Sequence, residues 1–549
     1  MSSSTLLEIF GHVLFSFTKS VTDHYNPEEP EFNNELFGYN PLESTGREWY
    51  YHPVDELVYQ EYGGKDLITS TSYLAASSLD VKVIDACSTE VNETEANEIK
   101  VDNNSGTAWK RLRPSVCRTI LQSLSIGALI SLLAAIISGA EYILISYLCY
   151  ETINVCEFEP QRTSIPLRVQ WMRTIVIAMA YFFLYNWFFS NVLLLFRFYQ
   201  LHGLKRKLFL AFSIPFCIDA TYRITLQALG MSFSKLSLIQ NIPTNINFLT
   251  SFGVQVYLLA KHFCTQSVKR QISLFCQMTV PLCLTFIIGM IFKYLIYPAY
   301  IKEDTNGKLL IAVFAPLTGV LLKPIARICA QRLWNITHPG YSYVLSAPLY
   351  YGSAVVFRIL QADLDNLWSI ALLGIIHGAA EVIERSAMVL IDHICHVLCK
   401  RTSAPLGSFR TPRRERLMAD IAIMSMLSES AAIVSVNGVI YLYQWVYIED
   451  SSWSKLLQSF AIFTSVPLFI EWFFNSMSLA IETRYQNMAV MAVWRKRWKR
   501  HFLVAIVNTV PIALTLSTNQ IAVVHERFDR IRVKPCRVPF TRNFTSTSS

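Results

Sequence analysis

The residues with the clearest capacity for chemistry lie in the apolar segment HGAAEVIERSAMVLIDHICH, which begins at His377. On a helix of 3.6 residues per turn, its ionisable side chains form one stripe with a basic neighbour: His377, Glu381, Glu384 and Asp392, with Arg385 beside them. A charge at the centre of a bilayer costs about 3 kcal/mol or more, so such residues face the bundle interior and are paired or functional. A low dielectric also disfavours an ionised carboxylate, which suits it to carrying a proton. The stripe is therefore predicted to be a transport or proton-relay site.

A structural interpretation of the same stripe stays open. In that case Arg385 neutralises Glu381 or Glu384 within the helix, and the residues near Asp392 lie at the cytoplasmic interface. The two interpretations differ in whether the carboxylates are accessible to water and solutes.

Two further carboxylates, Glu429 and Glu471, lie deep inside later apolar runs and join the relay candidates. We expect Lys293 and Arg385 to supply their counter-charges. Arg358 lies near the end of an apolar run, so we expect its side chain to reach the interface.

A different pattern occurs between residues 208 and 229, where Asp219 and Arg223 are four residues apart. That spacing predicts an ion pair within one helix.

Metal binding has a partial signal. His377, Glu381 and Glu384 share one helix face, but one helix does not close a coordination sphere unless Glu429 or Glu471 converges on it. No cysteine pair has zinc-site spacing. The sequence therefore predicts neither a metal nor a cofactor.

Enzymatic motifs are scarce. The chain has no G-x-S-x-G, H-E-x-x-H, Walker or G-x-G-x-x-G motif. The order of Asn335 and His377 resembles the Asn and His arrangement of membrane-bound O-acyltransferases, and this resemblance implies His377 as a catalytic base. The aromatic residue expected before the histidine in that family is Ile376 here. An enzymatic activity is thus an alternative to transport and not the leading hypothesis.

The elements that must position these residues are membrane-spanning helices. Hydrophobic residues make up 52% of the 549 and charged residues only 16%, against about 25% charged in soluble domains. Long apolar runs repeatedly supply the ~20 residues that one span requires. We expect an all-α polytopic bundle of about eleven (ten to twelve) helices: 117–147, 174–197, 208–229, 246–263, 272–299, 309–330, 341–360, 367–395, 419–447, 455–481 and 502–524.

Charge divides the chain into three regions. Residues 1–113 form an acidic segment, of which the first hundred hold 18 Asp and Glu against 5 Lys and Arg, and we expect it to be partly disordered. Residues 114–525 form the bundle, and residues 526–549 form a basic polar tail. The other basic residues lie in short loops, which favours contact with lipid headgroups over nucleic-acid binding.

Loop charges also predict an orientation. Basic loops alternate with acidic ones, so the positive-inside rule places the N-terminal segment and the loop 400–416 in the cytoplasm. The loop 148–168 then lies outside, where Cys149 and Cys156 are candidates for a disulfide.

We therefore expect a carrier of a small solute or ion, coupled to a proton or cation through the 367–395 helix. The alternatives are an acyltransferase-like enzyme and a non-catalytic scaffold or receptor. A carrier predicts a water-lined cavity that reaches Glu381 and Glu384, whereas a scaffold predicts the same polar groups mutually satisfied without one. An acyltransferase predicts a tunnel on which Asn335 and His377 converge. Neither the substrate nor an oligomeric state follows from the sequence.

Overall fold

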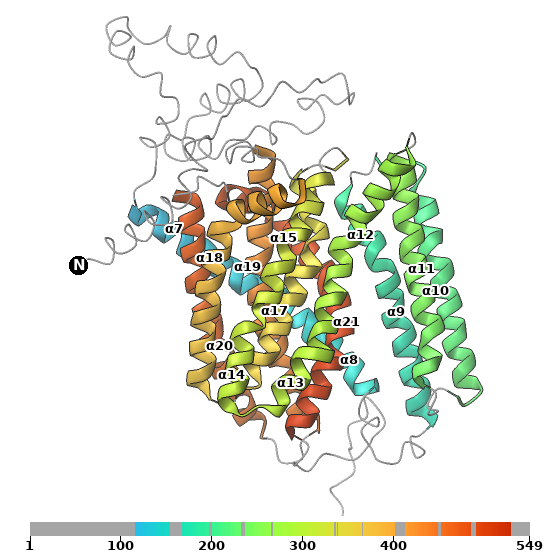
Figure 1. The fold of residues 1–549 in the computed structure, drawn as a ribbon. Coiled ribbons are helices and arrows are strands. Elements are labelled where there is room, and N and C mark those ends of the chain that lie inside the picture. The colour runs from blue at the N-terminus through green and yellow to red at the C-terminus, as the bar shows by residue number, and fades with distance from the viewer. Residues whose placement is uncertain are drawn as a thin grey trace, which may run out of the picture.

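The structure is a computed structural model and describes eleven segments of the chain (Figure 1). They are residues 116–153, 167–196, 200–231, 237–264, 267–333, 336–337, 339–364, 366–400, 412–447, 452–484 and 490–528. Every regular element within these ranges is a helix and none is a strand. The all-α prediction is therefore confirmed. The segment 1–113, the tail from 529 onward, Asn335 and Cys156 fall outside the described residues.

The first part of the bundle contains five long helices, two of which are interrupted by a π-helical turn. They are α7 (Val116–Ala134), η3 (Ala135–Gly139) and α8 (Ala140–Ile153); α9 (Leu167–Leu195); α10 (Lys205–Ala228); α11 (Ser237–Phe263); and α12 (Val268–Ile291), η5 (Phe292–Ile296) and α13 (Tyr297–Lys302).

The second part contains the helices that carry the predicted site. They are α14 (Thr305–Phe314) and α15 (Pro316–Arg332); α16 (Pro339–Ser342), η7 (Tyr343–Leu345) and α17 (Ala347–Ala362); α18 (Leu367–Lys400); α19 (Pro412–Tyr447); α20 (Trp453–Arg484); and α21 (Val490–Phe528).

Ten of these helices or helix series are long and apolar enough to cross a membrane. They correspond to ten of the eleven expected spans, and a polytopic membrane protein is therefore confirmed. The exception is α11, whose length is sufficient but whose sequence is rich in amides. In Figure 1, α11 nevertheless runs beside α10.

Polar side chains of α11 donate hydrogen bonds to backbone carbonyl groups of α10. Pro215 has no N–H to donate to the carbonyl of Ala211, and the hydroxyl of Ser251 donates to that carbonyl instead, at 2.8 Å. Asn247 donates to the carbonyl of Pro215 at 2.7 Å and to the hydroxyl of Tyr185 at 3.0 Å. In a lipid environment these contacts satisfy backbone groups that water cannot reach.

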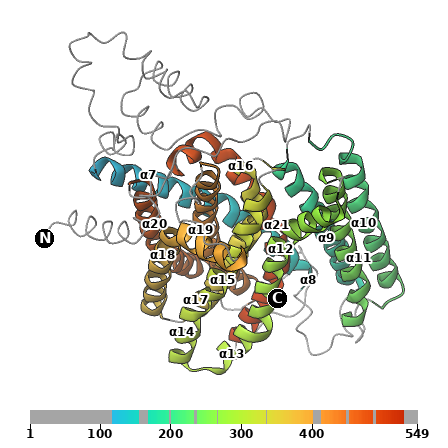
Figure 2. The same ribbon diagram turned by 45° about the horizontal axis from the view of Figure 1, so that its top comes forward.

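The helices fall into two groups in Figures 1 and 2. One group is a trio, α9, α10 and α11, which lie side by side at one edge. In the other group α19 packs against α7, α17, α20 and α21. The spans that contain α17 and α19 are each 94% buried, whereas those of α10 and α20 are 17% buried. The bundle is therefore built around α17 and α19.

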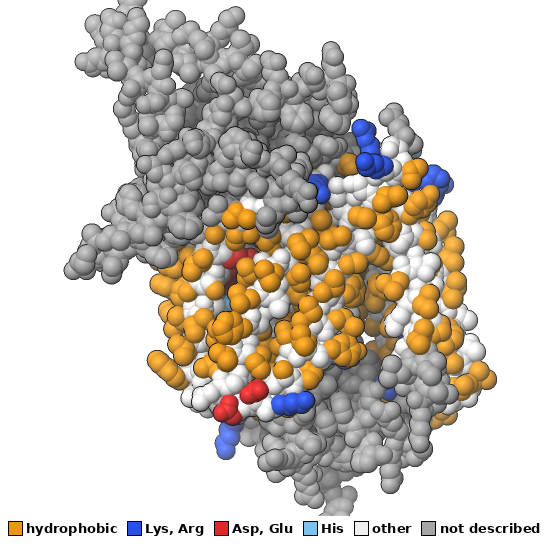
Figure 3. Space-filling model, viewed as in Figure 1, with side chains coloured by type: hydrophobic (Ala, Val, Ile, Leu, Met, Phe, Trp, Pro, Cys, Tyr) orange, Lys and Arg blue, Asp and Glu red, His pale blue; other side chains and the backbone are white. Residues whose placement is uncertain are grey.

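Apolar side chains cover the outer face of the bundle (Figure 3). Exposed residues of this kind include Leu129, Ile218, Leu321 and Phe469, and the Lys and Arg side chains visible in this view lie at its two ends. An apolar belt between charged ends is the surface that a bilayer requires.

Candidate functional site

The centre of the site is Arg358 on α17. Its Nη2 donates to Oε2 of Glu471 on α20 at 2.5 Å and to Oε2 of Glu429 on α19 at 3.3 Å. Its Nη1 donates to Gln361 at 2.7 Å. All three charged side chains are at most 5% exposed, so one guanidinium joins three helices in the interior.

The expectation that Arg358 reaches the interface is wrong. Its helix lies at the centre of the bundle, and the side chain is only 3% exposed because neighbouring helices surround it. The counter-charge of Glu429 and Glu471 is Arg358 and neither of the two expected residues: Lys293 is exposed on η5, and Arg385 pairs with Glu482.

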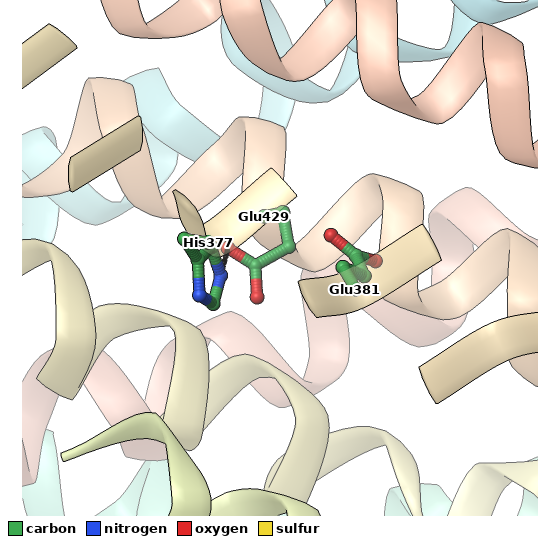
Figure 4. Close-up of side chains that lie close together, drawn as sticks. All are labelled: His377, Glu381 and Glu429. Atoms are coloured by element: carbon green, nitrogen blue, oxygen red, sulfur yellow. Dashed lines mark ion pairs between the residues drawn. The ribbon is translucent and has the colours of Figure 1, made fainter. Parts of the chain in front are cut away.

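Beside this pair lie His377 and Glu381, both on α18. The Nε2 atom of His377 is 3.4 Å from Oε2 of Glu429, and the imidazole stacks on the ring of Phe357 with centroids 3.9 Å apart. Glu381 accepts a hydrogen bond from Ser425 of α19 at 2.9 Å. Figure 4 shows the His377, Glu429 and Glu381 side chains next to one another.

Glu381 also has an acidic neighbour. The carboxyl group of Glu471 lies close enough to interact with it electrostatically. Within the described part of the chain, Glu381 has no Lys or Arg at ion-pair distance. Glu381 is therefore the carboxylate of the site with the weakest charge compensation.

Glu384, one turn further along α18, has basic partners on α15. Lys323 Nζ lies 3.0 Å and Arg327 Nη1 3.7 Å from its carboxylate oxygens. Arg327 also donates to the hydroxyl of Tyr350 at 3.0 Å. Arg327 lies within α15, and its side chain is fully buried. Lys323 was not singled out from the sequence, although it lies within an apolar run as Glu429 and Glu471 do.

Arg385 pairs with a residue that the sequence did not single out. Its Nε and Nη2 atoms donate to the two carboxylate oxygens of Glu482 on α20, both at 2.8 Å, and Nη1 donates to Asn475 at 3.1 Å. Asn475 in turn donates to Glu471 at 3.0 Å. Arg385 therefore forms a bidentate pair between helices, and not the pair within α18 that the structural interpretation assumed.

We call this group of buried charged residues the charge cluster. Its members are Lys323, Arg327, Arg358, His377, Glu381, Glu384, Arg385, Glu429, Glu471 and Glu482. It contains five carboxylates and four Lys or Arg side chains. With a neutral histidine and ionised carboxylates, its net charge is −1. One bound proton or one bound monovalent cation therefore neutralises the cluster as a whole.

A small open cavity of about 70 Å³ has Arg358 in its wall, and its lining includes neither Glu381 nor Glu384. Its polar lining includes Gln361, Asn437 and Gln444. Asn437 donates to the carbonyl of Phe463 at 3.0 Å, a group that Pro467 cannot satisfy because it lacks an N–H. A space with amide and guanidinium groups in its wall can hold water or a polar solute.

Not every predicted residue joins the cluster. The side chain of Asp392 lies outside the described residues, as do Asn335 and the loop with Cys156. The cluster therefore contains six of the seven relay candidates: His377, Glu381, Glu384, Arg385, Glu429 and Glu471.

No family model, curated protein sequence or solved structure matches the chain.

Proposed function

We propose that this multi-pass membrane protein is a carrier of a small solute or ion, coupled to a proton or cation that binds in the charge cluster. The observation that carries the proposal is that Arg358, the side chain that holds Glu429 and Glu471, also lines an open cavity. A purely structural network has no need of such an access route. A carrier needs both a buried ion site and a path to it.

The coupling step follows from the ion pairs. When Glu471 is protonated, its attraction to Arg358 weakens, and with it the link between α20 and α17. When the proton leaves, the ion pair re-forms and draws these helices together. Occupancy of the cluster thereby biases the relative position of two helices, which is the requirement for alternating access.

The experiment is a charge-displacement recording on proteoliposomes fixed to a solid-supported membrane. A rapid pH jump should displace charge as protons enter or leave the cluster. Glu471→Gln keeps the shape of the side chain but removes its charge, and it should abolish most of this signal. The matched control is Asp219→Asn, which removes a carboxylate of α10 outside the cluster and should leave the signal unchanged.

The same recordings identify the cargo class. Inorganic cations, amino acids, sugars and organic anions are added in turn, and a carrier gives a current with at least one class that Glu471→Gln removes. A folded protein with neither a pH-jump signal nor a solute-dependent current would contradict the proposal.

A further inference from the structure

Three potential metal ligands converge in the charge cluster. One ligand atom each from His377, Glu381 and Glu429 can be chosen such that all three lie within 4.8 Å of one another (Figure 4). His377 and Glu381 are one turn apart on α18, and Glu429 faces them from α19. The sequence analysis required a carboxylate from another helix for a metal site, and Glu429 meets that condition.

The imidazole of His377 is the second observation that points to a ligand. Its Nδ1 atom makes no hydrogen bond, and Nε2 has the 3.4 Å contact with Glu429 as its polar contact, although the side chain is only 11% exposed. Its contact with Glu429 has ion-pair length but not hydrogen-bond geometry. A buried polar atom without a partner destabilises the fold by about 1–3 kcal/mol. A metal ion bound to a ring nitrogen removes that penalty, and the stack on Phe357 already fixes the ring orientation.

Local charge favours a divalent ion. Glu381, Glu429 and Glu471 adjoin one another, and Arg358 is the cation within ion-pair distance of them. If these carboxylates are ionised, two negative charges remain in excess at this point. Arg358 lies closer to Glu471 (2.5 Å) than to Glu429 (3.3 Å), so it can stay with Glu471 while Glu429 turns to the metal.

We propose that His377, Glu381 and Glu429 bind one divalent first-row transition-metal ion, of which Zn²⁺ and Mn²⁺ are the test cases. One imidazole nitrogen with carboxylate oxygens suits these ions, whereas Mg²⁺ and Ca²⁺ prefer oxygen ligands alone. Metal–ligand distances of about 2.1 Å put two ligands at most ~4.2 Å apart, so small side-chain rotations close the site. If the proposed carrier function holds, such an ion is its cargo or coupling ion; metal binding itself does not depend on it.

The test uses the full chain, purified in detergent and stripped of metal with a chelator. Isothermal titration with Zn²⁺ and Mn²⁺ should give one site per chain for at least one of them. Visible absorption of the Co²⁺-loaded protein should report nitrogen and oxygen ligation. His377→Gln and Glu381→Gln should each weaken binding at least about tenfold, because each removes one of three ligands. Glu141→Gln, a substitution of the same kind in α8, should leave affinity unchanged.

His377→Gln replaces a neutral imidazole with a neutral amide and so leaves the formal charge of the site unchanged. This variant keeps the test valid if a carboxylate variant unfolds. Absence of stoichiometric binding, or binding that both variants retain, would overturn the metal site. If the wild type binds metal, both variants lose it, and no charge displacement is recorded, the metal site stands and the carrier function is rejected. Solute-dependent currents without metal binding would reject the site and retain the carrier.

Discussion

The trio α9–α11 and the charge cluster both contain buried charges, but they neutralise them differently. In the trio, Asp219 and Arg223 pair one turn apart on α10 at 2.9 Å, and the guanidinium lies over the ring of Tyr181. In the cluster, each Lys or Arg ion pair joins two different helices. A pair within one helix is indifferent to the positions of its neighbours. Pairs between helices make the charge state of the site and the arrangement of the bundle depend on each other.

The most disruptive change should be Arg358→Ala. It leaves Glu429 and Glu471 buried without their shared guanidinium, and loss of one partner of a buried pair costs about 3–5 kcal/mol. Thermal unfolding of the purified protein in detergent should show the loss as a large decrease in the midpoint. Arg358→Gln combined with Glu471→Gln should recover part of it, since neutral partners can hydrogen-bond. A wild-type midpoint for Arg358→Ala would mean that the cluster does not hold the bundle together.

The sequence predicted those features that depend only on residues close together in one helix. Apolar run length gave the spans, and four-residue spacing gave the pair of Asp219 with Arg223, which is confirmed. The same rule suggested an Arg385 pair within α18, but the actual partner is Glu482.

The remaining contacts could not be predicted because they join residues that are far apart in the chain. Arg358 is 71 residues from Glu429 and 113 from Glu471, and the packing of α17, α19 and α20 brings them together. Single-sequence periodicity identifies which face of a helix is polar, but it does not identify which helix that face meets.

The second-largest loss of stability should come from Gly378→Ala, which adds a methyl group at the contact between α18 and α20. A Cβ on Gly378 would lie 2.7 Å from Cγ and 3.0 Å from Cβ of Phe474, distances too short for carbon atoms. Gly378→Ala should therefore destabilise the protein by about 1–3 kcal/mol, the usual range for overpacking. Its melting midpoint should fall, and Phe474→Leu in the same chain should restore part of the loss. An unchanged midpoint would show that these helices move apart freely.

The trio should respond less to loss of its charges. Double-mutant cycles with Asp219→Asn and Arg223→Gln measure the coupling of that pair, which we expect to be about 1 kcal/mol or less. The guanidinium is partly exposed (12%) and keeps its contact with Tyr181 when the carboxylate is lost. A coupling energy as large as that between Arg358 and Glu471 would remove the distinction between the two regions.

The smallest effect should come from Gly253→Ala in α11, and its sign is opposite to that of Gly378→Ala. No heavy atom lies within 4 Å of a Cβ built on Gly253, so the added methyl group meets no neighbour within the described residues. Alanine is favoured over glycine in a helix by about 0.5–1 kcal/mol, because the unfolded chain has less backbone freedom to lose. The variant should therefore melt at the wild-type temperature or slightly above it. A clear decrease would mean that another molecule, such as a second copy of the chain, packs against this face of α11 in the purified protein. Size-exclusion chromatography with light scattering on wild type and variant would then test that explanation, since loss of such a contact lowers the molecular mass of the complex.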